Sequence, residues 1–256
     1  MKSFLSFTKK EFTEHFRTGK LLIITGVFIL FAVMSPLIAY FTPVLVEMLS
    51  ESMAQSGTQL TVGEVTAIDS WLQFLKNAPI MLIVFVLIES NIFTKEYQSG
   101  TLVLALTKGL KRHTVLLSKT FIMLTLWTAE YFMCYGITYV VNDIVWDNSV
   151  AESLGFMAIG GWLVGILAIS LMVLFSAIAK NNILVLAGTG GIVFGTYLIG
   201  NLPEIGQYMP TVLMNTSSLI YGLEEVEYFI PAVIITAAVS LVSIVISIPV
   251  LNKKYI

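Results

Sequence analysis

The sequence predicts an all-α integral membrane protein that forms one transmembrane domain over residues 1–256. Hydrophobic residues make up 57% of the chain and charged residues only 12%, whereas roughly a quarter of the residues in soluble domains are charged. Six apolar runs can form transmembrane helices, at about residues 21–41, 78–93, 116–140, 154–179, 183–202 and 229–251. All but one of the 14 Lys and Arg residues fall on one side of these runs, the exception being Lys76. The positive-inside rule therefore predicts that both termini are cytoplasmic.

Residues 1–20 precede the first span, and their pattern predicts an amphipathic helix in the lipid headgroup layer. Phe4, Phe12 and Phe16 recur at helical spacing, while Lys9 and Lys10 belong to a basic side. Such a pattern is typical of helices that lie in the membrane interface. A positively charged segment that only fixes the orientation of the chain is the alternative.

A helix needs about 20 apolar residues to cross a bilayer core about 30 Å thick. The first span, residues 21–41, meets this requirement. Pro36 within it is tolerated where a neighbouring helix or water satisfies the carbonyl that loses its partner. Residues 42–77 are more polar, and we expect two short amphipathic helices on the membrane surface there. Trp71 and Phe74 would then lie at the interface, where aromatic rings are enriched.

The second and third spans, residues 78–93 and 116–140, carry the acids Glu89 and Glu130. An ionised carboxylate at the bilayer centre costs at least about 2.5 kcal/mol, so such acids often face water, a partner or a transport route. Both are therefore candidates for a translocation path. The alternatives are structural: Glu130 hydrogen-bonds a neighbouring helix, and Glu89 lies at the inner boundary near Lys95.

The fourth and fifth spans, residues 154–179 and 183–202, are rich in small residues that allow close approach of helices. Gly188, Gly191 and Gly195 are candidates for helix packing or for a dimer interface, and Gly161 and Gly165 are candidates for packing. Residues 203–228 are too broken by proline and glycine to span but too apolar for a free loop. We expect an extracytoplasmic re-entrant or interfacial segment there, before the last span at 229–251.

The motifs of catalysis and of metal binding do not occur. His15 and His113 have no His or Cys partner at the spacing of zinc ligands, and no signature of a hydrolase or metalloprotease is found. The phosphate-binding motif Gly-x-x-x-x-Gly-Lys-Ser/Thr does not occur either. The sequence therefore predicts no catalytic or metal site and no cofactor in this chain, and Cys134, in an apolar run, is expected to be a small buried hydrophobe.

A polar, basic block at residues 94–115 separates the second and third spans. It reads Glu96-Tyr-Gln-Ser-Gly100-Thr101-Leu, then Thr-Lys108-Gly-Leu-Lys111-Arg112, and Lys119 opens the next span. This arrangement resembles the ABC-2 type permeases, in which an acidic residue precedes Gly-Thr-Leu, a leucine-rich turn, a basic residue and a lysine at the next span. The six-span layout extends the resemblance over nearly the whole chain.

The resemblance implies a permease subunit of a bacterial ABC exporter in the plasma membrane. Its partners would be two ATPase subunits that bind ATP and Mg, a second permease that is identical or homologous, and membrane lipid, with no nucleic acid. The block at residues 94–115 would be the cytoplasmic coupling helix. Within it Glu96, Gly100 and Thr101 would shape the turn, and Lys108, Lys111 and Arg112 would face the ATPase or lipid phosphates.

The cargo expected from such a chain is amphipathic or hydrophobic, such as a peptide, an antibiotic or a lipid. Two other classes of function stay open from the sequence. One is a non-transporting immunity or sensor subunit. The other is an ion-coupled secondary carrier that moves protons through Glu130 and Glu89.

Overall fold

The protein is a helical bundle in the computed structural model, which describes residues 2–53, 63–98, 100–107, 109–179, 181–202 and 204–253. No strand occurs within these ranges, which confirms the predicted all-α class. The α-helices are α1 (Lys2–Arg17), α2 (Lys20–Met53), α3 (Ala67–Glu89), α4 (Thr94–Gln98), α5 (Thr101–Thr107), α6 (Arg112–Val145), α7 (Leu154–Ile178), α8 (Asn182–Gly200), α9 (Ser217–Ile220) and α10 (Ile230–Lys253). Four short 3-10 turns join them: η2 (Asn148–Val150), η3 (Gly206–Tyr208), η4 (Pro210–Met214) and η5 (Val226–Phe229).

Five helical stretches of the described chain are long and apolar enough to cross a membrane. They are Lys20–Met48, Ala67–Glu96, Leu154–Ile178, Asn182–Gly200 and Val226–Lys253. The third predicted span lies within α6, a helix of 34 residues that is not among the five. Its polar residues include Lys119 and Glu130, and a crossing by α6 stays a prediction.

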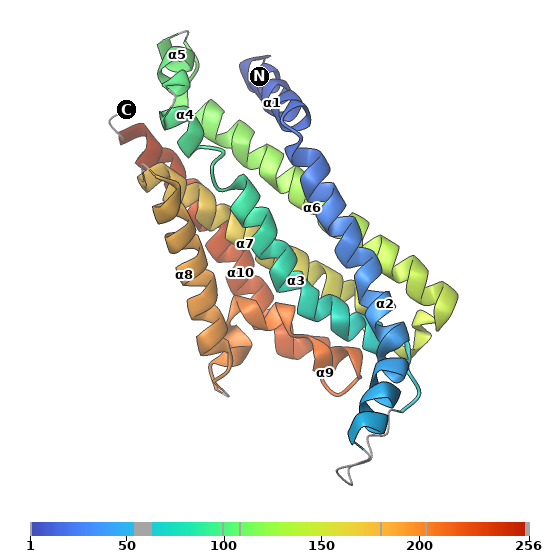
Figure 1. Cartoon of the computed structure of the whole chain (residues 1–256). Coiled ribbons are helices and arrows are strands. Elements are labelled where there is room, and N and C mark those ends of the chain that lie inside the picture. Colours follow the sequence, from blue (N-terminus) through green and yellow to red (C-terminus); the bar gives the residue numbers. More distant parts are fainter. Residues whose placement is uncertain are drawn as a thin grey trace.

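Both ends of the described chain lie at the same end of the bundle (Figure 1). The short helices α4 and α5 lie there too, beside α1 and the end of α10, while α9 lies at the opposite end. We call the first the α4–α5 end and the second the α9 end.

Helix α2 passes through both of its prolines, Pro36 and Pro43, and continues to Met53. Pro36 has no N–H to bond the carbonyl of Ala32. The hydroxyl of Thr138 on α6 donates to that carbonyl at 3.0 Å instead. The expectation that a neighbouring helix satisfies the freed carbonyl is therefore confirmed.

The prediction of two surface helices within residues 42–77 is wrong in the described part of that range. Its beginning extends α2, and its end belongs to α3, which starts at Ala67 rather than at residue 78. Trp71 and Phe74 are fully buried, with their ring centroids 5.7 Å apart. The indole N–H of Trp71 donates to Asn148 at 2.9 Å, so the ring is fixed inside the bundle rather than at an interface.

Helix α7 packs closely on α6 through two glycines. A Cβ on Gly161 would clash with the hydroxyl of Tyr131, and one on Gly165 would clash with the indole of Trp127. The Trp127 N–H donates to the carbonyl of Trp162 at 3.0 Å. The predicted packing role of Gly161 and Gly165 is confirmed, because only glycine leaves room for these two rings.

The broken segment before α10 packs against the bundle as three 3-10 turns, η3, η4 and η5, and the short helix α9. Leu213, Ile220 and Phe229 within it are almost completely buried. This segment closes the α9 end between α8 and α10, and its depth in a membrane stays a prediction.

Candidate functional site

The polar block predicted as a coupling helix consists of two short helices rather than one. Gly100, between α4 and α5, has a φ of +69°, a left-handed angle that favours glycine. No atom lies within 4 Å of the place where its Cβ would be, so the backbone angle and not the available space requires glycine there. Thr101 is the first residue of α5.

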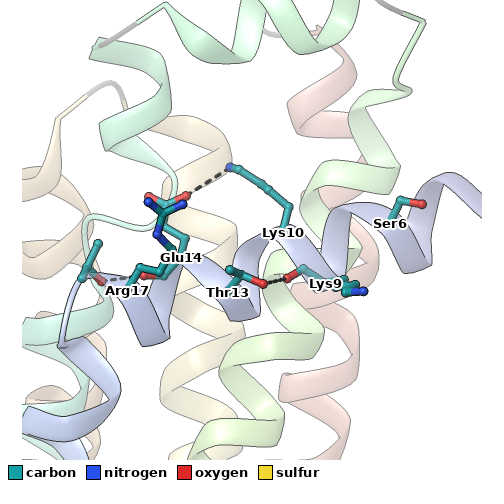
Figure 2. Close-up of a pocket in the computed structure, with 7 residues that line it drawn as sticks. Ser6, Lys9, Lys10, Thr13, Glu14 and Arg17 are labelled. Carbon is teal, nitrogen blue, oxygen red and sulfur yellow. Dashed lines mark hydrogen bonds and ion pairs between the residues drawn. The ribbon is translucent and has the colours of Figure 1, made fainter.

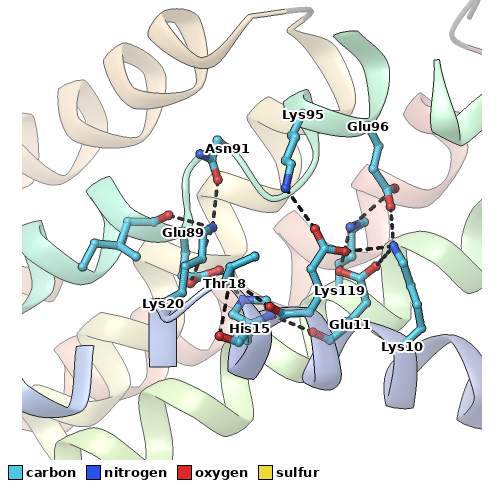
Figure 3. Close-up of polar contacts among 12 residues, drawn as sticks. Lys10, Glu11, His15, Thr18, Lys20, Glu89, Asn91, Lys95, Glu96 and Lys119 are labelled. Carbon is cyan, nitrogen blue, oxygen red and sulfur yellow. Dashed lines mark hydrogen bonds and ion pairs between the residues drawn. The ribbon is translucent and has the colours of Figure 1, made fainter. Parts of the chain in front are cut away.

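Glu96 on α4 points back into the bundle and joins two other helices (Figure 3). One carboxylate oxygen accepts from the ammonium of Lys10 on α1 at 2.9 Å. The other lies 3.4 Å from the ammonium of Lys119 on α6. The short helix α4 is therefore tied to both α1 and α6.

The centre of this cluster is a buried ion pair between Glu11 of α1 and Lys119 of α6. The Lys119 ammonium donates to Glu11 at 2.8 Å, and each side chain is only 2% exposed. The second oxygen of Glu11 accepts from Lys10 at 2.8 Å. Every carboxylate oxygen of Glu11 and Glu96 thus faces an ammonium, as buried charges require.

A second buried pair joins α1 to the end of α3. The His15 Nε2 atom lies 2.9 Å from a carboxylate oxygen of Glu89, and its Nδ1 atom lies 2.9 Å from the Glu11 backbone carbonyl. Both partners are acceptors, so the imidazolium, which carries two N–H donors, satisfies both contacts. Burial lowers the pKa of His15, but the hydrogen bond and charge of Glu89 raise it above its ordinary value of 6.5. The Lys20 ammonium lies 4.0 Å from the other oxygen of Glu89.

The outer edge of the cluster is more exposed. Lys95 donates to Glu14 at 3.0 Å, and both side chains are partly in solvent. Burial raises the pKa of Glu14, but Lys95 and Lys10 outweigh it and bring that pKa to about 2. Burial likewise lowers the pKa of Lys10, and its bonds to Glu11 and Glu96 leave it above the ordinary value. We call these pairs the α1 cluster; its members are Lys10, Glu11, Glu14, His15, Lys20, Glu89, Lys95, Glu96 and Lys119.

A neighbouring side of α1, which shares Lys10 and Glu14 with the cluster, is open and polar. A depression of about 710 Å³ runs along it, lined by Ser6, Lys9, Lys10, Thr13, Glu14, Arg17 and Thr18 (Figure 2). A third side carries Leu5, Phe12 and Phe16, which are 49–62% exposed. Buried ionic, polar and exposed apolar sides on one helix suit a position between the bundle, water and lipid.

The basic residues predicted to face a partner lie in different surroundings. Lys111 is exposed at the N-cap position of α6. Arg112 instead donates to the backbone carbonyls of Leu251 and Asn252 at 3.1 and 3.2 Å, so it binds the last turn of α10. Lys108 lies outside the described residues. Contact of these three residues and of Thr101 with an ATPase stays a prediction.

The two candidate acids of a transport path are far from equivalent. Glu89 is fully buried and belongs to the α1 cluster. Glu130 is 5% exposed and accepts from the hydroxyl of Thr25 on α2 at 2.6 Å, while its other oxygen has no hydrogen-bond partner. The hydrogen bond to Thr25 is the contact that the structural alternative for Glu130 expects, and a place on a transport path stays a prediction for both acids.

The three glycines of α8 also differ. A Cβ on Gly188 would lie 2.5 Å from the ring of Phe175 on α7, so Gly188 allows close packing within the chain. Nothing lies within 4 Å of a Cβ on Gly191 or Gly195. These two positions are open, and their role in a dimer stays a prediction. Cys134, by contrast, is fully buried, as expected of a small hydrophobe.

Sequence reasoning missed four members of the α1 cluster on its N-terminal helix. It placed Lys10 only on a basic side and considered His15 only as a zinc ligand, and it did not consider Glu11 or Glu14. Glu11 and His15 are spaced four residues apart and so share one side of a helix. The sequence signal that could have indicated a buried polar contact was this acid and histidine on one side of a helix that is otherwise apolar and basic.

The fold and the α1 cluster define a multi-pass membrane protein whose N-terminal helix is fixed to short helices at one end of the bundle. In the described chain, no three His, Cys, Asp or Glu side chains come together as a metal site would require. The family model described as ABC-2 family transporter protein matches residues 5–250. The chain therefore belongs to the ABC-2 transporter family, and it is a membrane component of an ABC transporter. A comparison with curated proteins finds no match.

Proposed function

We propose that the chain is the permease subunit of an ATP-driven exporter in a bacterial plasma membrane. Two separate ATPase subunits would bind ATP and Mg, and two permeases, identical or homologous, would enclose the path of an amphipathic or hydrophobic cargo. Membership of the ABC-2 family supports the permease role and a partnership with ATPases. Six crossings, with both ends and the α4–α5 end in the cytoplasm, agree with the position of the basic residues.

The observation that carries the proposal is the attachment of the short helix α4 to two longer helices, α1 and α6. An ATPase that moves α4 would pull on Glu96, whose carboxylate contacts Lys10 of α1 and Lys119 of α6. Lys119 is buried inside the bundle, so the displacement of a surface helix reaches α6 through ion pairs rather than through a flexible loop. This is the mechanical requirement of a coupling element.

Affinity purification of the tagged protein in mild detergent tests the proposal. A separate ATPase should copurify in comparable amount, and cargo should stimulate its ATP hydrolysis. Glu96→Gln should weaken that stimulation without preventing membrane insertion, whereas Glu227→Gln, an exposed position towards the α9 end, should leave it unchanged. A protein that copurifies with no ATPase and transports without ATP would overturn the proposal in favour of the ion-coupled carrier.

A sensor or immunity subunit is the second candidate. It would bind an ATPase through the same α4–α5 end but would show no turnover coupled to cargo. Stimulation of ATP hydrolysis by cargo therefore separates the two functions.

A further inference from the structure

A large groove lies between α3 and α8. Its volume is about 920 Å³, within the range of pockets that hold small molecules. Turns η4 and α9 close it toward the α9 end, and Ala168 of α7 lies at its base. Neither long helix fills it, because α3 and α8 border it from opposite sides.

Most of the groove wall is apolar. Leu82 and Ile83 of α3 face it from one side, and Leu186 and Phe194 of α8 from the other. Ile83 is 58% exposed and Phe194 is 61% exposed, so these side chains are not covered by the rest of the chain. Such a wall fits an alkyl chain or another elongated apolar body.

Two buried hydroxyls in this groove lack a partner. Thr189 is 1% exposed and Thr211 is 8% exposed, and the Oγ1 atom of each has no hydrogen bond. Other buried threonines of the bundle, such as Thr120 and Thr236, donate to a backbone carbonyl one turn earlier. A buried hydroxyl without a partner is unfavourable, so a ligand whose oxygen atoms reach Thr189 and Thr211 would remove that cost.

Among the residues that the structure describes, Lys76 is the only charged one that lines the groove. It is exposed and has no ion pair to an acid in the described chain. It is also the one basic residue that the sequence places away from the cytoplasmic side. A single unpaired cation beside an apolar wall is complementary to a molecule with one negative headgroup and an apolar body.

We propose that the α3–α8 groove binds an anionic amphiphile. Its negative headgroup lies at Lys76, its oxygen atoms accept hydrogen bonds from Thr211 and Thr189, and its apolar body lies along Leu82 and Phe194. The inference rests on the proposed function only in taking this amphiphile as cargo. A second copy of the chain fits the groove less well, because an isologous contact would bring Lys76 and its equivalent to the same interface with no acid in the lining.

Photo-crosslinking of the purified permease, without an ATPase, tests the site directly. The probe is a palmitate that carries a diazirine on its chain, added to protein in phosphatidylcholine nanodiscs, and labelled peptides are mapped by mass spectrometry. Label is expected on α3 and α8. Dodecanoate should compete better than dodecanol, and dodecyltrimethylammonium should compete least.

Two pairs of variants make the result specific. Lys76→Gln should weaken labelling by about tenfold, equivalent to about 1.4 kcal/mol, whereas Lys253→Gln, an exposed lysine at the other end of the bundle, should not. Gly190 lines the groove and has open space at its Cβ position, so Gly190→Phe should block labelling. Gly26→Phe, also at an open position but on α2, should not.

Label outside α3 and α8, equal competition by the three headgroups, or full labelling of Lys76→Gln would each overturn the inference. A disulfide formed between two copies through cysteines placed in the groove would overturn it in favour of a dimer contact. Because no ATPase is present, failure here leaves the exporter proposal intact. Conversely, selective labelling of a protein that copurifies with no ATPase and transports without ATP would retain the site and reject the exporter.

Discussion

At the scale of single residues, the ammonium of Lys119 is buried, and within the described part of the chain its ion-pair partners are the carboxylates of Glu11 and Glu96. Removal of one partner of a buried ion pair leaves the other charge uncompensated, which costs about 3–5 kcal/mol. Lys119→Met should therefore lower the free energy of unfolding by about that amount, because Glu11 keeps only Lys10. Thermal unfolding of the purified protein in detergent near pH 7 measures the change.

The matched control for this prediction is Lys9→Met, since Lys9 is exposed at the same end of the bundle. Surface substitutions of that kind usually stay within about 0.5 kcal/mol. The double variant Glu11→Gln with Lys119→Met should cost less than the two single changes together, because both charges are removed. Equal effects of Lys119→Met and Lys9→Met would contradict the importance of the pair.

The His15–Glu89 pair gives a pH dependence of opposite sense to that of Glu14. The folded state raises the pKa of His15 above 6.5, so the stabilisation is complete below 6.5 and is lost as the pH rises through the raised value. The unfolding temperature of the wild type should accordingly fall as the pH rises above 6.5. His15→Gln, which cannot carry a charge, should show a flatter profile there, and an identical slope in wild type and variant would reject the charged pair.

Two controls separate this window from others. His113→Gln changes an exposed histidine and should keep the profile of the wild type. The pKa of Glu14 is lowered from 4.5 to about 2, so its contribution is present above 4.5 and is lost as the pH falls toward 2. Glu14→Gln should therefore change the acidic limb of the profile and not the region above pH 6.5.

At the scale of elements, Gly100 sets the angle between α4 and α5 through its backbone conformation. A left-handed angle costs roughly 1–2 kcal/mol for most residues, whereas asparagine tolerates it better. Gly100→Val should thus reduce the stimulation of a bound ATPase more than Gly100→Asn does. The free space at this position excludes a simple clash as the cause.

The measurement is ATP hydrolysis by the copurified ATPase with each variant, normalised to the amount of permease in the membrane. Equal stimulation with the valine and asparagine variants would show that the angle of the turn does not matter. Loss of membrane insertion in the valine variant alone would assign Gly100 to folding instead.

The elements that the sequence predicts well are those defined by uninterrupted apolar runs. Residues 154–179 and 183–202 match α7 and α8 closely because length and composition determine such helices locally. The end of α2 and the start of α3 were not predictable in this way. Polar residues in both obscure the pattern, and the burial of Trp71 depends on Asn148, which is distant in the sequence.

At the scale of the whole molecule, α1 is bound into the cluster through side-chain contacts with residues that are 74 to 108 positions away in the sequence. The sequence places Glu96, Gly100 and Lys119 in one motif, but it does not indicate that Glu11 and His15 of the N-terminal helix are their partners. Pairing over such distances follows from how α1 lies across α3 and α6, which a local pattern does not encode. The groove between α3 and α8 was equally hidden, because Lys76 acquires its apolar surroundings only in the folded chain.

The position of both ends at the α4–α5 end of the bundle leads to a prediction for membrane topology. Six crossings place both ends on the cytoplasmic side, whereas five would separate them. Single cysteines in a Cys134→Ala background distinguish the two cases, using exposed positions: Lys9 and Asn252 near the ends, and Val150 and Leu223 in the connections at the α9 end. An impermeant maleimide added to intact cells should label the cysteines at Val150 and Leu223, and those at Lys9 and Asn252 only after permeabilisation. If the cysteines at Lys9 and Asn252 instead differ in their labelling, α6 does not cross the membrane. The interpretation of Lys119 as a buried link between a coupling element and a membrane-spanning helix would then be wrong.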